Sequence, residues 1–255
     1  NRLTDASQTY AYDGAGRLAS ISLPGSPPVL KSESTYDRAG NVTVTHRPGE
    51  KVTVNVFDGA NRLKATATAP GACNLDQTHA YNGDGLRMTS ETYCGNSATT
   101  TYRVYDLSRK LPVVLYELDN QAGTSLSGSQ KTAYVYGAAL LARYVTTATP
   151  GTNSRGQYYF QDGRGNVKTL ITRQSRLYSG YNYTSVSYDE YEYDAFGTQT
   201  KVTVNGQTVV TNGVSNNTLE VADNPYQFQS EPKDPNGTIY LRACLLYTSD
   251  AADEG

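Results

Sequence analysis

Residues 12–18 read Tyr12-Asp13-Gly14-Ala15-Gly16-Arg17-Leu18, and this seven-residue pattern returns along the chain. An aromatic residue and Asp come first, Gly follows at the fifth position, and an apolar residue closes the pattern. Copies begin at residues 12, 36, 57, 81 and 105, which are steps of 24, 21, 24 and 24 residues. The residues that carry the copies are Tyr12, Asp13 and Gly16; Tyr36, Asp37 and Gly40; Phe57 and Asp58; Tyr81 and Gly85; Tyr105 and Asp106; Asp162 and Gly165; and Tyr193, Asp194 and Gly197. Such self-similarity is the signature of stacked repeats.

Each copy predicts a tight turn between two strands. Asp at the first turn position can accept backbone N–H bonds from residues further on. Asp followed by Gly three residues later suits a type I turn, and Gly can adopt a positive φ that forms a bulge into the next strand. One hairpin is unstable alone, whereas stacked hairpins bury a shared face.

The segments between the copies also read as strands. Residues 52–56 alternate as a half-buried strand does, and Asn205-Gly206 stands between two alternating runs, which is a strong hairpin signal. The chain has 22 Tyr, 4 Phe and no Trp, together with 23 Gly and 10 Pro, which favours strands and turns. We therefore predict an all-β fold of repeated β-hairpins in a curved sheet strip.

Bulk composition argues against several classes of function. The net charge of −2 argues against a strongly basic nucleic-acid binder. No run of 18 apolar residues occurs, so we expect no membrane span. No nucleophile triad, phosphate loop or dinucleotide fingerprint is present, and we expect no cofactor.

The repeated pattern resembles the YD repeat of the RHS family. Residues 134–143, 158–167 and 191–197 are similar to segments of the RHS repeat-associated core. A closing block of that core is matched by Asn224, Pro225, Tyr226, Phe228, Gly237, Tyr240, Leu241 and Arg242. Residues 229–234 depart from the family pattern. We accordingly expect YD repeats over 1–110 and an incomplete core over 111–243.

Residues 244–255 resemble a translated sequencing adaptor, so we expect them to be a non-native tail.

The resemblance to the RHS family implies a β shell (solenoid- or barrel-like) that encloses and delivers a C-terminal effector of the same polypeptide. It implies a secreted or cell-surface protein, with secretion-system or cell-surface partners. Self-cleavage in this family uses aspartates of a later motif, which these 255 residues do not contain, so we expect no enzyme activity of this chain.

Candidate chemical groups each have a structural interpretation as well. The repeated Asp residues are expected to hold turns rather than to act as catalytic carboxylates, and residues 82–85 lack the ligands of a calcium loop. Cys73 and Cys94 either form a disulfide or are two free buried thiols, and both alternatives stay open. His46 and His79 are expected at the surface.

Two further functions compete with encapsulation. An adhesion or carbohydrate-binding module would expose Tyr clusters, since Tyr is enriched at binding sites. A self-cleaving core would need aspartates downstream. The shell interpretation instead places Tyr and Val on the concave face of the sheet, whereas an adhesin would expose its Tyr clusters on the convex face.

Overall fold

The structure is a computed structural model that describes residues 8–49, 52–69, 76–95, 97–121, 130–146, 153–178, 181–193, 199–211, 214–215, 224–234, 239–240 and 245–246. The chain forms two compact units, which are residues 1–81 with 90–98, and residues 82–89 with 99–255. The sequence-based boundary between 110 and 111 stays a prediction about family segments.

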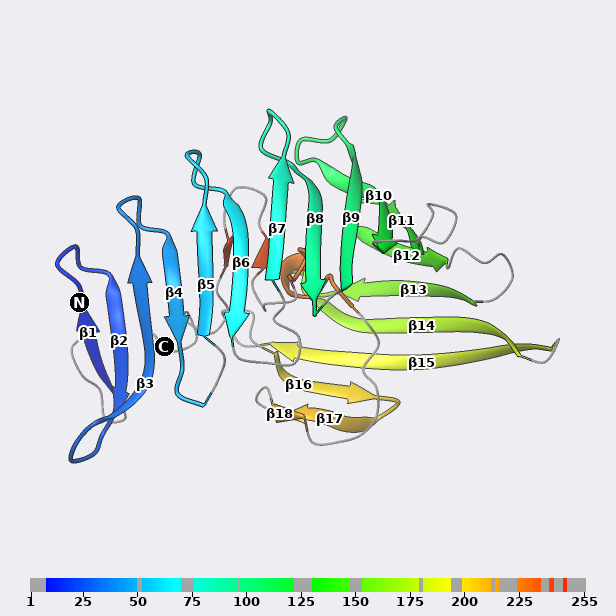
Figure 1. The fold of residues 1–255 in the computed structure, drawn as a ribbon. Coiled ribbons are helices and arrows are strands. Elements are labelled where there is room, and N and C mark those ends of the chain that lie inside the picture. The colour runs from blue at the N-terminus through cyan, green and yellow to red at the C-terminus, as the bar shows by residue number, and fades with distance from the viewer. Residues whose placement is uncertain are drawn as a thin grey trace. The chain divides into compact units, whose positions relative to one another are not determined.

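The first unit is a run of antiparallel hairpins in which each strand pairs with the next (Figure 1). Its strands are β1 (Thr9–Tyr12), β2 (Leu18–Leu23), β3 (Val29–Tyr36), β4 (Val42–His46), β5 (Val52–Phe57), β6 (Leu63–Ala69) and β7 (Asp76–Tyr81). Strand β8 (Arg87–Cys94) contributes residues to both units.

The second unit continues the same pattern, with consecutive antiparallel pairing from β9 to β18. Its strands are β9 (Ser97–Asp106), whose first two residues belong to the first unit, β10 (Val113–Gln121), β11 (Gln130–Tyr136), β12 (Leu140–Thr146), β13 (Asn153–Gln161), β14 (Val167–Tyr178), β15 (Tyr181–Tyr193), β16 (Gln199–Val204), β17 (Gln207–Thr211) and β18 (Val214–Ser215). A short 3-10 turn, η2 (Phe228–Ser230), precedes the pair β19 (Ile239–Tyr240) and β20 (Leu245–Leu246). The all-β fold of repeated hairpins is therefore confirmed.

The turns fall where the sequence motifs place them. The strand register shifts by one residue just before the turn, for example between Ala11 and Tyr12 in the β1–β2 pair, which is a β-bulge. Asn205 and Gly206 have φ of +49° and +82°, so both adopt the left-handed conformation that a two-residue hairpin turn needs.

The core of the second unit lies on one face of its strands. Tyr134, Leu140, Leu170, Tyr191 and Val202 are buried together there. Residues of the closing block pack on this face, where the rings of Tyr134 and Tyr226 meet edge to face at 5.2 Å between centroids. Tyr side chains are not confined to it, because Tyr158 and Tyr188 are exposed.

Strand β5 buries its polar side. The predicted strand is present, but Val54 and Val56 are exposed while Asn55 is buried. The amide of Asn55 is satisfied by two hydrogen bonds, which removes most of the cost of burying it. Among the described residues, no helix is long and apolar enough to cross a membrane.

Candidate functional site

The first repeat turn is closed around the carboxylate of Asp13. Asp13 Oδ1 accepts the backbone N–H groups of Ala15 and Arg17, each at 2.9 Å, and Oδ2 accepts Arg17 Nε at 2.7 Å. The N–H of Gly16 donates to the Asp13 carbonyl at 2.9 Å, and Gly16 has a φ of +77°. Hydrogen bonds from the side chain and then the backbone of Arg17 lower the pKa of Asp13. The carboxylate therefore serves as a turn clamp.

The same clamp recurs with substitutions. Asp37 and Asp162 bond the side-chain amides of Asn41 and Asn166, which stand where the first copy has Arg17. The uncharged Asn82 caps its turn by accepting the N–H groups of Asp84 and Leu86. In the third copy, Asp58 binds Arg62, and Asn61 with a φ of +59° replaces Gly. In the fifth copy, Asp106 binds Ser108 and Arg109. Asp194 and Gly197 lie outside the described residues.

A tyrosine hydroxyl ties one repeat to the preceding one. In the first unit, Tyr36 Oη donates to the Leu18 carbonyl and Tyr81 Oη to the Leu63 carbonyl, each at 2.7 Å. In the second unit the bonds run from Tyr105 to the Arg87 carbonyl at 2.8 Å and from Tyr193 to the Val167 carbonyl at 3.0 Å. The donor is always the first residue of a copy and the acceptor the last residue of an earlier copy. We call these contacts the tyrosine ties.

The third copy lacks the tie and replaces it. Phe57 has no hydroxyl, so it cannot donate to Val42, the last residue of the second copy. Asn55, two residues earlier on β5, donates Nδ2 to the Val42 carbonyl at 3.1 Å instead. Its Oδ1 accepts the hydroxyl of Thr66 at 2.9 Å. The carbonyl at the end of the second copy is thus satisfied by a different donor.

Arginine at the sixth position forms a second link between turns. The Arg17 guanidinium lies 4.7 Å from the centroid of the Tyr36 ring, and its Nη1 donates to the Asp37 carbonyl at 2.7 Å. Arg62 lies 4.9 Å from the Tyr81 ring in the same way. A cation over an aromatic face adds attraction beyond the hydrogen bond.

The closing block docks on the turn at 162–167 of the second unit. The Val167 N–H donates to the Gln227 carbonyl at 2.9 Å, and the Gln229 N–H donates to Asn166 Oδ1 at 3.0 Å. The Ser230 hydroxyl donates to the Gly165 carbonyl at 2.8 Å. A repeat turn therefore also serves as the seat for a distant segment of the chain. Gly237, Leu241 and Arg242 of the predicted block lie outside the described residues.

A buried ion pair fastens the same block at a second point. Arg87 Nη1 lies 2.7 and 2.9 Å from the two carboxylate oxygens of Asp234, with side-chain exposures of 2% and 10%. The Arg87 guanidinium also stacks over Tyr240, 4.0 Å from the ring centroid. We call this group the Arg87 clasp. Sequence reasoning missed it because Asp234 lies in the stretch that departs from the family pattern.

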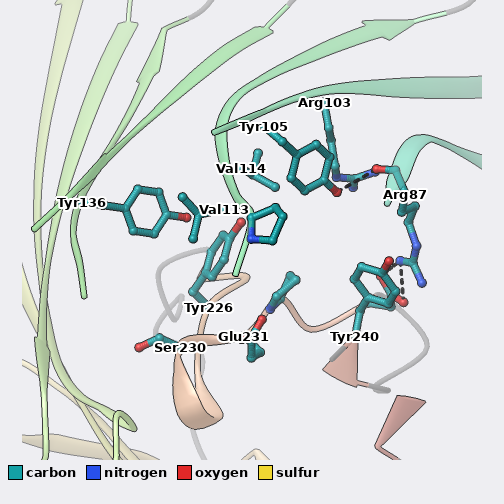
Figure 2. A pocket seen from close by; sticks show the side chains of 13 residues that line it. Arg87, Arg103, Tyr105, Val113, Val114, Tyr136, Tyr226, Ser230, Glu231 and Tyr240 are labelled. Atoms are coloured by element: carbon teal, nitrogen blue, oxygen red, sulfur yellow. Dashed lines mark hydrogen bonds and ion pairs between the residues drawn. The ribbon is translucent and has the colours of Figure 1, made fainter. Parts of the chain in front are cut away.

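A small cavity of about 50 Å³ lies beside the Arg87 clasp. Figure 2 shows Tyr105, Tyr136, Tyr226 and Tyr240 around it, with Arg87 and Arg103 toward one side. This volume holds a few water molecules and is far below the several hundred Å³ of a typical ligand pocket. The cavity is thus a small, partly open space between the closing block and the sheet.

A second, half-buried group of charged side chains lies near this cavity. Arg103 Nε donates to Glu117 Oε1 at 2.9 Å, and the Tyr134 hydroxyl donates to Glu117 Oε2 at 2.5 Å. Burial by itself would lower the pKa of Arg103, but the combined electrostatic attraction of Glu117, Tyr105, Asp234 and Tyr226 outweighs burial, and the pKa is raised. Burial likewise raises the pKa of Tyr134 and Tyr226. At neutral pH the Arg103 guanidinium is therefore charged and both phenols are protonated.

The titratable groups of the described residues form no metal centre, since no cluster of three or more His, Cys, Asp or Glu side chains occurs among them.

His79 is buried, so the expectation that it lies at the surface was wrong. Alternation along β7 puts His79 on the same buried side as Gln77, and its Nδ1 lies 3.1 Å from the Ser90 hydroxyl. His46 pairs with Glu33 near the surface at 2.9 Å. Cys94 is disulfide-bonded, but Cys73 lies outside the described residues, so their pairing stays a prediction.

Comparison with known proteins finds no matching family model and no matching curated protein. Two solved structures, "Crystal Structure of TcdB2-TccC3-TEV" and "Crystal Structure of TcdB2-TccC3-Cdc42", match 94% and 93% of this chain at 15% and 14% identity, each with a TM-score of 0.48. A third, a Tc holotoxin pore from Photorhabdus luminescens, matches 94% at 11% identity with a TM-score of 0.35. This chain spans 14%, 14% and 18% of the length of those three solved chains.

Proposed function

We propose that this chain is a wall segment of an RHS-type β shell, which encloses and delivers an effector encoded further along the same polypeptide. The tyrosine ties carry the proposal. They link one repeat to another by a bond that recurs at the same motif position in both units. This regularity supports a protein built as a continuous wall, and the sequence resemblance to YD repeats supports the identity of that wall.

The proposed mechanism is mechanical and kinetic rather than catalytic. Pairing each strand with the next satisfies the backbone groups between neighbouring hairpins, which keeps the wall from opening between them, and closure of the complete shell would remove sheet edges from solvent. The closing block, held by the 162–167 turn and by the Arg87 clasp, would hold the end of the wall in place. In this proposal the protein acts outside the producing cell or at its surface, and the effector is its principal partner.

The test is to recover the natural reading frame from the source DNA and to express it complete. The proposal expects coding sequence that continues from residue 243 into a core motif and then an unrelated region that is toxic when expressed alone. The complete protein should be at least about tenfold less toxic than that region. A reading frame that runs through residues 244–255 into a cell-wall anchor would refute the delivery proposal and the adaptor assignment together.

Exposed tyrosines of the second unit favour adhesion as a second candidate. Tyr158 on β13 aligns with Ile171 on β14 and Tyr188 on β15, and the Tyr144 ring meets the Tyr158 ring edge to face at 6.2 Å between centroids. Tyr144, Tyr158 and Tyr188 are all exposed, as ring-stacking contacts to sugars require. The adhesion candidate predicts glycan binding that is lost in Tyr158→Ala with Tyr188→Ala and kept in Tyr102→Ala, whereas encapsulation predicts no glycan binding in any of them.

A further inference from the structure

Among the described strands, none pairs with the first half of β15 on the side away from β14, and we call this stretch the open edge. Strand β14 pairs with β15 over the whole length, from Thr169 opposite Glu190 to Tyr178 opposite Tyr181. On the other side, β16 pairs only with residues 189–193 of β15. Figure 1 shows the long arrows of β14 and β15 extending beyond β16 and β17. Within the part of the chain that the structure describes, no strand pairs with residues 181–187 on that side.

The bonds of Tyr188 reveal which backbone groups face the open side. Its N–H donates to Asn205 Oδ1 at 2.9 Å, and its carbonyl accepts the Asn205 N–H at 2.8 Å. Backbone groups alternate in direction along a strand, and the β14–β15 register has no shift. The N–H and carbonyl groups of Thr184 and Val186 therefore point to the same open side as those of Tyr188, and so does the backbone of residue 182.

This edge lacks the features that normally prevent strand pairing. Residues 181–187 read Tyr-Asn-Tyr-Thr-Ser-Val-Ser, with no charge, no Pro and no Gly. Tyr, Thr and Val are strand-forming residues, and natural edges are usually blunted by Lys, Pro or a bulge. Tyr183 and Val186 are 57% and 47% exposed, so apolar surface accompanies the open backbone.

We propose that this edge is an interface between two copies of the chain, which pair antiparallel through β15 across a two-fold axis. Such a pairing is self-complementary, because each outward N–H of one copy meets an outward carbonyl of the other. The absence of charge over residues 181–187 means that a strand facing its own copy meets no like-charge repulsion. Tyr183 and Val186 would gain cross-strand neighbours and lose exposure to water.

Sedimentation of the whole chain tests the interface, with reductant present to exclude disulfide-linked dimers. We expect a reversible monomer–dimer equilibrium that Thr184→Lys weakens at least about tenfold, since an edge charge opposes pairing. Ser175→Lys is the matched control, because Ser175 lies opposite Thr184 on β14, a strand paired on both sides. It should change the dimer dissociation constant less than about threefold.

Amide hydrogen exchange locates the contact residue by residue. In the monomer, the amides of Tyr183 and Ser185 face β14 and should exchange slowly, whereas those of Thr184 and Val186 should exchange fast. Raising the protein concentration should protect Thr184 and Val186 in step with the dimer fraction. A chain that stays monomeric up to about 1 mM, a concentration at which even weak specific pairing is populated, would overturn the proposal, and so would a dimer that leaves these two amides unprotected.

Discussion

At the scale of single residues, the stability contributed by a tyrosine tie can be tested at position 57, where Phe57 lacks the hydroxyl and Asn55 bonds the Val42 carbonyl instead. Asn55→Ala should destabilise the chain by about 1–3 kcal/mol, because it leaves the Val42 carbonyl and the Thr66 hydroxyl without this partner. Adding Phe57→Tyr to that variant should recover about 0.5–1.5 kcal/mol by restoring a tie to Val42. The free energy of unfolding from denaturant titration measures both changes.

Phe57→Tyr alone provides the reference for this double-mutant cycle. In the unchanged chain it should shift the free energy of unfolding by no more than about 0.5 kcal/mol, since Asn55 already bonds the Val42 carbonyl. Equal effects of Phe57→Tyr in both backgrounds would show that Asn55 and position 57 do not share an acceptor.

Removing one hydroxyl group is enough to delete an intact tyrosine tie. Tyr81→Phe deletes the hydroxyl that donates to the Leu63 carbonyl while leaving the ring under Arg62. The expected loss is about 0.5–1.5 kcal/mol of unfolding free energy. Tyr102→Phe, on an exposed face of β9, should change it by less than about 0.5 kcal/mol, and equal losses in the two variants would contradict a specific role for the tie.

Residue-level reasoning from sequence identified the turn residues and the strand at residues 52–56, but it did not determine which side of β5 is buried. The Val-Thr-Val-Asn-Val alternation identifies a strand. Period-two alternation alone does not decide which side is buried when neighbouring strands offer hydrogen-bond partners to the polar side. Asn55 is buried because the carbonyl of Val42 and the hydroxyl of Thr66 satisfy it. Those partners belong to other strands, so no local pattern reveals them.

At the scale of the turn, the clamped aspartates link stability to pH. Side-chain hydrogen bonds from Arg17 and Asn41 lower the pKa of Asp13 and Asp37 in the folded state. A lowered folded-state pKa means that the stabilisation is complete above the unfolded value of about 4 and is lost as the pH falls through the folded value. Thermal melting temperatures should stay level from about pH 7 to pH 5 and fall below about pH 4.

Asp13→Asn tests the source of that acid sensitivity. Asn keeps the cap geometry, as Asn82 shows in the fourth copy, but it has no carboxylate to protonate. The variant should lose less stability than the unchanged chain between pH 5 and pH 3, about the range in which an Asp takes up its proton. Asp84→Asn is the matched control, because it removes the same charge from a residue inside a turn rather than from the residue that caps it. An identical acid profile in Asp13→Asn and the unchanged chain would rule out the clamp as the origin.

At the scale of the element, the hairpins could be predicted from sequence, whereas the docking contacts of the closing block could not. The motif places Asp, Gly and the bulge within seven residues, so local chemistry determines each turn. Asn205-Gly206 is equally local. The docking of Gln229 on Asn166 and of Asp234 on Arg87 joins residues 63 and 147 positions apart, and nothing in the sequence nearby encodes such partners.

At the scale of the whole molecule, the Arg87 clasp should control how firmly the closing block is held. Asp234→Asn leaves the Arg87 charge buried without its counter-ion, and losing one partner of a buried pair costs about 3–5 kcal/mol. We expect proteolysis within residues 224–234 to be faster in Asp234→Asn than in the unchanged chain, as measured by mass spectrometry of the fragments.

Replacing both partners separates loss of charge from loss of packing. Arg87→Met with Asp234→Leu removes both charges and should restore most of the protection, because an apolar pair leaves no buried ion. Equal proteolysis in Asp234→Asn and the unchanged chain would show that the clasp does not hold the block.

Encapsulation itself is tested most directly by protease protection in the complete protein. The complete reading frame, purified in its native state, is treated with a broad-specificity protease, and survival of the region after the core is followed over time. The account predicts that this region survives until the wall itself is unfolded by denaturant. A downstream region cleaved as fast as the same region expressed alone would contradict the account.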